Sequence, residues 1–415
     1  MNGILWIRQT DVDPALWSQP VGGVALLKRQ ARLLRAAGVT RLVVVGAAGS
    51  ESAMASIQTG RLAVVADIHP IITDGTDLSG ISAALLPDVP TLILDASDLY
   101  ERGALKRAVD HGADSDQWFS ARGLAVVGTA HTTAALTAFA AGEHGPTPLP
   151  ERDDDYVGAI TDSASHTVVQ HTLWERCRKV ADGVVSRNLN RHISLFISKR
   201  IAHTGISPNQ ISTVTLILGL VGAFLASHGT YWMVLGGAVL LKANSVLDGV
   251  DGELARMRIQ SSVLGEWLDT VSDDLSNQSF FLGVGIGTAY VTGDPMWLWL
   301  TVAAAVPLFL TSALYYYWLI KMGRGDLLVF SWFRTEARTA HELAQRGIKE
   351  RVIDIISPLF RRDAFVMLLL VMSVFGVVQY SLFFVAPAAL GTFIAILLRT
   401  IQGNVVTPST DGEAA

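Results

Sequence analysis

The chain has 415 residues, of which 50% are apolar, and 32 basic residues stand against 37 acidic ones. This near balance of charge gives no reason to expect a nucleic acid as a partner, whereas a positive mean hydropathy indicates that part of the chain lies in lipid. The single cysteine, Cys177, excludes an intramolecular disulfide and a multi-cysteine metal site. Because the first 20 residues lack a basic stretch followed by an apolar core, no cleaved signal peptide is expected, and the N-terminus is expected in the cytoplasm.

Residues 1–160 alternate short β-branched runs with helical patterns. The runs "RLVVVGA", "LAVVAD", "PTLILD" and "GLAVVG" are typical of buried strands, and "VALLKRQARLLRAAG" is typical of an amphipathic helix. This alternation predicts a cytoplasmic α/β domain with a mostly parallel sheet. The stretch 142–156, rich in Gly, Pro and Asp, is expected to be a surface loop or a boundary.

Residues 161–205 are expected to form a linker and an amphipathic juxtamembrane helix. Apolar residues recur there at helical spacing among basic ones, which are Arg176, Arg178, Lys179, Arg187, Arg191, Lys199 and Arg200. Such a helix is expected to lie on an anionic lipid surface. The alternative is an ordinary linker helix with a solvated basic face.

Residues 206–403 contain six long apolar stretches, and 404–415 are expected to be a disordered tail. The stretches run over about 208–228, 231–254, 262–290, 296–320, 363–380 and 382–402, each near the ~20 residues that span a bilayer. The linkers on one side contain no Lys or Arg, whereas the other side is basic. The positive-inside rule therefore predicts a multi-pass protein of the cytoplasmic (inner) membrane with both termini in the cytoplasm.

Four carboxylates recur at helical spacing at the cytoplasmic ends of the second and third predicted spans. Asp248 and Asp251 are three residues apart, and Asp269 and Asp273 are four apart, so each pair projects from one face of a helix. Carboxylates at lipid depth repel one another unless cations neutralise them. Oxygen ligands without His or Cys select Mg²⁺ or Mn²⁺, with Ca²⁺ as an alternative. The competing interpretation is a cytoplasmic loop that happens to be acidic.

Arg256 places a fixed cation beside these carboxylates, which suits a phosphate group. Gly252 and Gly265 lack side chains where a ligand or a partner helix must come close, although each is equally typical of helix packing. Metal ions together with a spare carboxylate are what phosphoryl transfer requires. Lys242 lies midway along the second predicted span, and the sequence assigns it no role.

Eight of these positions carry a family resemblance. Asp248, Asp251, Gly252, Ala255, Arg256, Gly265, Asp269 and Asp273 match the pattern D-x2-D-G-x2-A-R-x8-G-x3-D-x3-D with every spacer intact. The chain thus resembles the CDP-alcohol phosphotransferase (CDP-alcohol phosphatidyltransferase) family. The resemblance implies a six-helix membrane enzyme, usually a homodimer, that displaces CMP from a CDP-alcohol with a second alcohol.

The resemblance also implies roles for individual residues. Asp248, Asp251, Asp269 and Asp273 would bind the metals, expected as two Mg²⁺ or Mn²⁺ ions, and Asp273 would also be the general base. The nucleotide would contact Gly252, Ala255, Arg256 and Ser262. Because "SPNQIS" resembles a nucleotide-facing element of the family, Asn209 and Ser212 are added to this set.

The α/β domain and the stretch after it resemble a second pattern. They look like fusions of an inositol-phosphate cytidylyltransferase with a di-inositol-phosphate phosphate synthase, and "LILDASDLY" resembles the metal-bearing strand end of the first enzyme, with Asp95 or Asp98 at the position of interest. The opening "GILWIRQTDVDPALWSQPVGG" lacks the Gly-rich A-G-G-x-G-x-R loop and the following Lys. This departure favours a degenerate nucleotidyltransferase-like domain with a structural or regulatory role.

Three functions are compared. The first is a membrane transferase that uses a donor such as CDP-diacylglycerol or CDP-inositol and an acceptor such as inositol phosphate or glycerol phosphate, in phospholipid or inositol-phosphodiester synthesis. Arg361 and Arg362, at the start of the fifth predicted span, are the candidates for binding the phosphate of the acceptor. The second is a bifunctional enzyme whose first domain also makes the CDP-alcohol from CTP. The third is a divalent-cation transporter, which would need polar residues along the whole membrane path.

Overall fold

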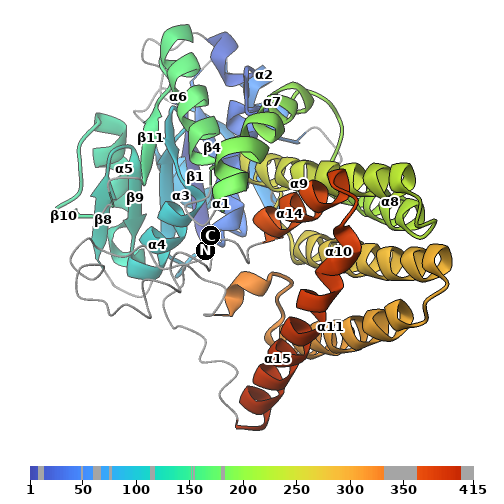
Figure 1. Cartoon of the computed structure of the whole chain (residues 1–415). Coiled ribbons are helices and arrows are strands. Elements are labelled where there is room, and N and C mark those ends of the chain that lie inside the picture. The colour runs from blue at the N-terminus through green and yellow to red at the C-terminus, as the bar shows by residue number, and fades with distance from the viewer. Residues whose placement is uncertain are drawn as a thin grey trace, which may run out of the picture. The chain divides into compact units, whose positions relative to one another are not determined.

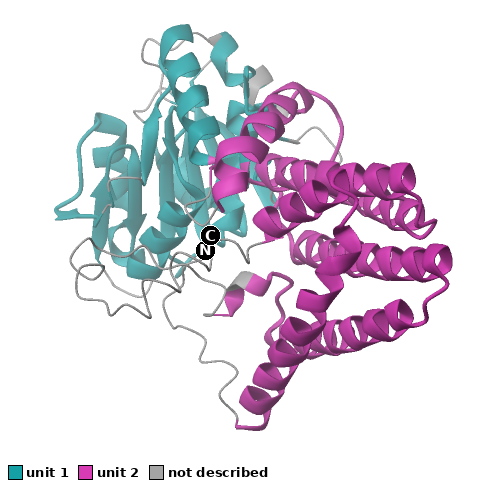
Figure 2. Cartoon of the chain, viewed as in Figure 1, with its two compact units in different colours: residues 1–176, 257–259, 410–415 teal, residues 177–256, 260–409 magenta. Residues whose placement is uncertain are grey.

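The structure is a computed structural model that describes residues 1–7, 14–47, 50–58, 67–73, 77–112, 117–150, 152, 155–178, 183–330 and 362–402. The described chain divides into two compact units (Figure 2). The first comprises residues 1–176 with 257–259, and the second comprises residues 177–256 and those from 260 onward.

The first unit is an α/β unit built on a seven-stranded sheet. Its strands are β1 (Asn2–Trp6), β4 (Arg41–Gly46), β5 (Asp67–Ile72), β6 (Thr91–Asp95), β8 (Trp118–Ala121), β9 (Leu124–Val127) and β10 (Thr147–Pro148), in the order β10-β8-β9-β6-β1-β4-β5. Two short ribbons pair β2 (Pro20–Val21) with β3 (Val24–Ala25) and β7 (Asp98–Tyr100) with β11 (Tyr156–Ala159). The helices are α1 (Leu26–Ala36), α2 (Glu51–Gln58), α3 (Ser79–Ala84), α4 (Arg102–Gly112), α5 (Thr132–Ala141) and α6 (Ser163–Arg176).

Strands β6, β1, β4 and β5 run parallel, and β9 runs antiparallel to β6 and β8. Alternate strand residues such as Ile4 and Val43 form one core with residues of α3 and α5. Helix α4 lies on the opposite face, because a Cβ added at its Gly112 would lie 2.8 Å from Val126 Cγ1, and α1 packs against α4. The sheet is therefore covered on both faces, as buried parallel strands require (Figure 1).

Three of the expected strands are confirmed. "RLVVVGA", "PTLILD" and "GLAVVG" correspond to β4, β6 and β9. The run "LAVVAD" (62–67) lies almost wholly outside the described residues, and β5 begins at its last residue, Asp67.

The second unit consists of helices. They are a π-helical turn (Ser186–Asn190) that leads into α7 (Arg191–Ile201), followed by α8 (Pro208–Ala226), α9 (Tyr231–Arg258), α10 (Val263–Thr292), α11 (Met296–Met322), α14 (Arg362–Val374) and α15 (Leu382–Ile401). Short 3₁₀ turns occupy Leu327–Val329 and Val378–Ser381. Helices α8, α9, α10 and α11 run side by side (Figure 1).

Small residues let α8 approach both of its neighbours. A Cβ added at Gly222 of α8 would lie 2.8 Å from the carbonyl oxygen of Gly237 on α9, and one added at Gly283 of α10 would lie 2.3 Å from that of Ala223 on α8. Backbones that come this close are typical of helix pairs in membranes, where packing replaces the hydrophobic effect. Larger side chains at these positions would separate the helices.

Four helical segments of the described chain are long and apolar enough to cross a membrane: Pro208–Ala226, Tyr231–Arg258, Met296–Met322 and Val378–Ile401. The expected number of six spans is not confirmed. The third expected span corresponds to α10, which carries the acidic residues, and the fifth to α14, of which 13 residues are described.

The expected linker, residues 161–205, contributes to both units, since α6 belongs to the first and α7 to the second. The basic residues of α7 also differ in their exposure to solvent. Lys199 and Arg200 are exposed, as a surface helix predicts, but Arg191 is buried. The expected tail, residues 404–415, lies outside the described residues.

Candidate active site

Three carboxylates from two helices meet in the second unit. Asp248 and Asp251 lie on the last turns of α9, and Asp269 lies on α10. One oxygen of each lies within 4.8 Å of the other two. Two oxygens on opposite sides of Mg²⁺ are about 4.2 Å apart at ordinary Mg–O distances, so these groups can close on one cation with shifts of less than about 1 Å. The donor set therefore fits a hard divalent cation.

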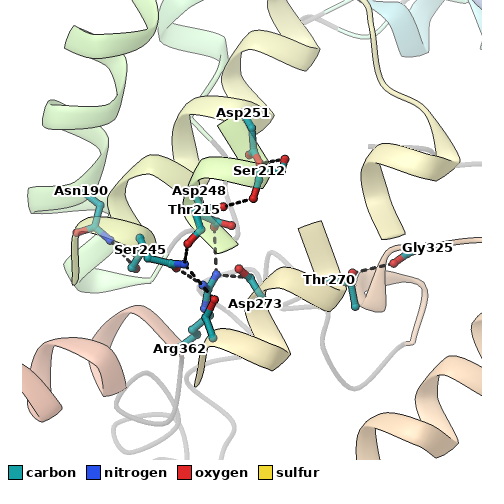
Figure 3. A network of polar contacts seen from close by, with 12 residues as sticks. Asn190, Ser212, Thr215, Ser245, Asp248, Asp251, Thr270, Asp273, Gly325 and Arg362 are labelled. Carbon is teal, nitrogen blue, oxygen red and sulfur yellow. Dashed lines mark hydrogen bonds and ion pairs between the residues drawn. The ribbon is translucent and has the colours of Figure 1, made fainter. Parts of the chain in front are cut away.

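Asp251 is the buried member of the group, with 6% of its surface exposed. Its Oδ2 accepts a hydrogen bond from Ser212 on α8 (Figure 3). Ser212 is positioned by the way α8 begins: Ser207 caps the helix, Pro208 occupies its first turn, and Gln210 completes a capping box. The stretch "SPNQIS" thus serves as a helix start that directs one hydroxyl to a carboxylate of the site.

The first turns of α8 and α10 lie next to each other. Ser262 caps α10 and accepts a hydrogen bond of 3.1 Å from the Gly265 amide. A Cβ added at Gly265 would lie 3.3 Å from Asn209 Oδ1 and from Ser262 Oγ. The absence of a side chain at Gly265 therefore leaves room beside Asn209, and two helix N-termini with partial positive charge adjoin this place.

Gly252, Ala255 and Arg256 follow Asp251 on α9. A Cβ added at Gly252 would lie 3.2 Å from Arg256 Nη1, so the glycine makes room for the guanidinium. Arg256 donates a hydrogen bond of 3.1 Å to the carbonyl of Cys177. This contact holds the arginine along α9, on the part of the helix that carries the carboxylates.

Arg362, the first residue of α14, lies among the carboxylates (Figure 3). Its Nη1 contacts Oδ2 of Asp248 at 3.1 Å and forms an ion pair with Asp273, while Nη2 donates to Asn244 Oδ1 at 3.1 Å. Asp273 is thus paired with Arg362 and does not belong to the group of three carboxylates. Arg361 lies outside the described residues.

Asn244, Asp274 and Glu266 also make polar contacts near the carboxylates, and the sequence analysis does not single them out. Asn244 lies one turn before Asp248 and bonds to α8 through the Thr215 carbonyl and to α10 through Ser276. Its spacing of four from Asp248, which puts both on one face of the helix, is a signal that could have identified it. Asp274, next to Asp273, accepts hydrogen bonds of 2.8 Å from Ser312 and Tyr316 on α11.

The third contact lies at the start of α10. Glu266 accepts a hydrogen bond of 3.1 Å from the amide of Gly325, whose carbonyl accepts one of 2.7 Å from Thr270. The segment after α11 is thereby held against the α10 turn that carries Asp269. Nothing in the sequence pattern distinguishes Glu266 from a solvated acidic residue.

In the first unit, Asp95 and Asp98 are both engaged by neighbouring residues. Ser97 donates to Asp95 through its amide (3.0 Å) and its hydroxyl (2.6 Å), and the Tyr156 hydroxyl donates to Asp98 at 2.7 Å. Burial, and then the hydrogen bond to Asp98, raise the pKa of Tyr156 above its usual value. The two aspartates line a cavity of about 120 Å³, smaller than the ~300 Å³ at which small-molecule sites begin.

Comparison with known proteins finds a family match within the helical unit. Residues 205–332 match the CDP-alcohol phosphatidyltransferase family, so the chain contains a CDP-alcohol phosphatidyltransferase domain in its C-terminal half. A bifunctional IPC transferase and DIPP synthase from Aquifex aeolicus is 43% identical over 94 residues, which are 23% of this chain and 21% of that protein.

Two further relatives come from archaea. A protein of the same name from Thermococcus kodakarensis is 35% identical over 123 residues, 30% of this chain and 27% of that protein. An archaetidylinositol phosphate synthase from Pyrococcus horikoshii is 37% identical over 93 residues, 22% of this chain and 47% of that protein. In each comparison the matched part of the chain spans less than half of the relative's length.

Proposed function

We propose that the chain is a membrane transferase that moves a substituted phosphate group from a CDP-alcohol to an acceptor alcohol and releases CMP. The observation that carries this proposal is the group formed by Asp248, Asp251 and Asp269, whose oxygens lie within 4.8 Å of one another inside the matched domain. A group of carboxylates without His or Cys is suited to hard cations and to diphosphate substrates.

Asp248, Asp251 and Asp269 would hold a first divalent cation, Mg²⁺ or Mn²⁺, and Asp273 would complete the site for a second. The cations would neutralise the negative charge of the diphosphate and of the departing CMP. Ser212 would orient Asp251 for the cation, because its hydroxyl donates to Oδ2 of this carboxylate.

The donor would bind across the N-termini of α8 and α10. Asn209, Ser212 and Ser262 supply polar groups there, and both helix starts favour negative charge. Gly252 and Ala255 are small residues that leave space beside α9, so that Arg256 can reach the nucleotide diphosphate.

Asp273 would take the proton of the acceptor hydroxyl as that oxygen attacks the β-phosphorus of the donor. The bond from this phosphorus to the CMP oxygen breaks, and CMP leaves with the electron pair. A carboxylate suffices as the base because the proton moves late in a loose transition state.

Arg362, together with Arg361, would bind the phosphate of the acceptor. Arg362 already contacts two carboxylates of the site, so an anionic acceptor would compete with Asp248 and Asp273 for its guanidinium. An acceptor phosphate drawn to Arg362 would bring its alcohol beside Asp273.

Inositol phosphate is the acceptor we favour over glycerol phosphate, with CDP-diacylglycerol or CDP-inositol as donor. The name of the Pyrococcus horikoshii relative, archaetidylinositol phosphate synthase, supports an inositol phosphate. The product would be a phosphodiester in phospholipid or inositol-phosphodiester synthesis.

The membrane unit, residues 206–403, would cross the inner membrane six times, with α10 and α14 as the third and fifth spans and with the site and both termini in the cytoplasm. We expect it to act as a homodimer. The long apolar helices support the membrane assignment, and the absence of Lys and Arg from the opposite linkers supports the orientation.

The first unit, residues 1–160 in the division expected from the sequence, would be a degenerate nucleotidyltransferase-like domain with a structural or regulatory role. The hydrogen bond from Tyr156 to Asp98 and the small volume of the adjoining cavity support this role over the making of a CDP-alcohol. A bifunctional enzyme would instead release pyrophosphate from CTP and a phosphorylated alcohol.

The test is release of CMP by the purified full-length protein in lipid nanodiscs. CDP-diacylglycerol and CDP-inositol are each supplied with inositol phosphate or glycerol phosphate, with and without EDTA. We expect release that depends on the acceptor, stops on chelation and returns with Mg²⁺ or Mn²⁺. Failure of every pair with the cations present would contradict the proposal, and pyrophosphate release from CTP would favour the bifunctional alternative.

A further inference from the structure

Helix α9 carries a second set of polar residues on the side away from the carboxylates. Lys242, Ser245, Gly249 and Glu253 follow one another at spacings of three and four residues, so they form a single stripe along the helix. At about 100° per residue, this stripe lies roughly 140° round the helix axis from the face of Asn244, Asp248 and Asp251. The stripe therefore belongs to a different contact.

That contact is with the juxtamembrane helix. Asn190, Arg191, Ser194 and Ser198 form a matching stripe on α7 and the turn before it, and all four are buried. We call the two stripes together the polar seam. It is defined by Asn190, Arg191, Ser194 and Ser198 on one side and Lys242, Ser245, Gly249 and Glu253 on the other.

Glu253 forms the strongest contact of the polar seam. Its side chain is fully buried, and it accepts hydrogen bonds from Arg191 Nη1 (2.8 Å), Ser194 Oγ (2.7 Å) and Ser198 Oγ (2.6 Å). A buried carboxylate is costly unless it is paired and hydrogen-bonded, and this one is both. The contact cannot be broken on one side without leaving a charge uncompensated.

The other end of the seam has the opposite charge. Lys242 donates a hydrogen bond of 2.8 Å to Asn190 Oδ1, and Asn190 in turn approaches Ser245 at 3.4 Å. Gly249, between the two ends, allows close approach, since a Cβ there would lie 3.1 Å from Ser194 Oγ. A cation at one end and an anion at the other fix the register, because a shift of α7 along α9 would unpair both.

We propose that Glu253 is a positioning residue for the carboxylate site, acting through α9, and that the polar seam holds this helix in the orientation that brings Asp248 and Asp251 to the cation. This inference rests on the proposed function of these carboxylates as cation ligands. Glu253 lies two residues after Asp251, so the seam fixes the turns of α9 that carry both ligands. Outer contacts that orient metal ligands commonly change cation affinity by 10- to 100-fold.

The test compares Glu253→Gln, Arg191→Met, the double variant and the milder Ser198→Ala in the full-length protein. Ser373→Ala is the matched control, because Ser373 is a buried serine of the same unit whose hydroxyl, among the described residues, donates to a carbonyl of its own helix, that of Leu369. Mn²⁺ binding is measured by electron paramagnetic resonance in nanodiscs, and unfolding is followed separately.

We expect Glu253→Gln and Arg191→Met to weaken Mn²⁺ binding about tenfold or more, and Ser198→Ala to weaken it several-fold. The double variant should lose less Mn²⁺ affinity than the product of the two single fold-losses, because it leaves no unpaired charge. Ser373→Ala should bind as the wild type does.

Wild-type Mn²⁺ affinity in Glu253→Gln and Ser198→Ala, together with a lowered unfolding temperature, would overturn the inference, since the seam would then be only structural. Absence of Mn²⁺ binding by the wild-type protein itself would overturn the proposed function, and this inference with it. If Glu253→Gln fails to fold, Ser198→Ala decides the question.

Discussion

Replacing Arg362 is predicted to destabilise the protein by an amount that depends on whether cations are bound. Without divalent cations its guanidinium is the positive charge that pairs with Asp248 and Asp273. The change to Gln keeps a hydrogen-bonding side chain but leaves neighbouring carboxylates without this compensation. The variant should therefore be less stable than the wild type in EDTA, and much less affected when cations take over the role of the missing charge.

The structure sets the size of the effect. Removing one partner of a fully buried ion pair costs about 3–5 kcal/mol. The side chains here are 28%, 25% and 24% exposed for Arg362, Asp248 and Asp273, so solvent screening reduces the expected cost to about 2 kcal/mol. For a unit of this size that corresponds to a fall in Tm of roughly 4–8 °C in EDTA.

The single cysteine makes the assay direct. Cys177 is buried, so a thiol-reactive fluorescent dye reports the unfolding of the unit that contains it. Arg362→Gln and the control Arg324→Gln, an exposed arginine after α11, are heated in EDTA and in saturating Mn²⁺. A fall in Tm of equal size in both conditions, or no fall in EDTA, would refute the role of Arg362 as the counter-charge of the site.

Two further predictions concern single side chains. Asp273→Asn should abolish CMP release, whereas Asp274→Asn should retain at least a tenth of it. Because Asp274 accepts a hydrogen bond from Tyr316, Asp274→Asn should instead lower the free energy of unfolding by about 1–3 kcal/mol. Equal loss of CMP release in both variants, measured in the same assay, would contradict the different roles given to the two aspartates. Because the pKa of Tyr156 is raised in the folded state, its contribution to stability is present below pH ~10 and is lost as the pH rises toward the folded pKa. Tyr156→Phe should lower the free energy of unfolding, measured in urea, by about 1.5 kcal/mol at pH 8 and by less at pH 11. A loss of stability that is the same at both pH values would argue against the hydrogen bond to Asp98.

The positions of the carboxylates on their helices could be predicted from spacing alone. Intervals of three and four residues place Asp248 with Asp251 on one face of α9, and the short connection to α10 brings Asp269 to them. Strands β4, β6 and β9 of the first unit were predicted for the same reason, since a short β-branched run between turn residues has few other structures available to it. In both cases the information lies within a few neighbouring residues.

The contacts that could not be predicted join residues far apart in the chain. The sequence pattern predicts Arg191 on a basic surface, because an amphipathic pattern does not distinguish a charge that faces water from one that faces a buried carboxylate 62 residues later. Arg362 is separated from Asp248 by 114 residues. Asp273 and Asp274 are adjacent in sequence, yet they point about 100° apart on α10 and so contact different helices.

The polar seam also bears on how the protein is made. Helix α9 carries Lys242 and Glu253 as well as two aspartates, and each charged residue makes insertion of a single helix into the bilayer costlier by up to about 3 kcal/mol. Helix α7 precedes α9 in the chain and therefore leaves the ribosome first. The residues that pair with the lysine and the glutamate of α9 in the folded protein, Asn190 and Arg191, are therefore synthesised before α9 itself. Because α7 is synthesised before α9, it can assist the insertion of α9, the helix that carries Asp248 and Asp251.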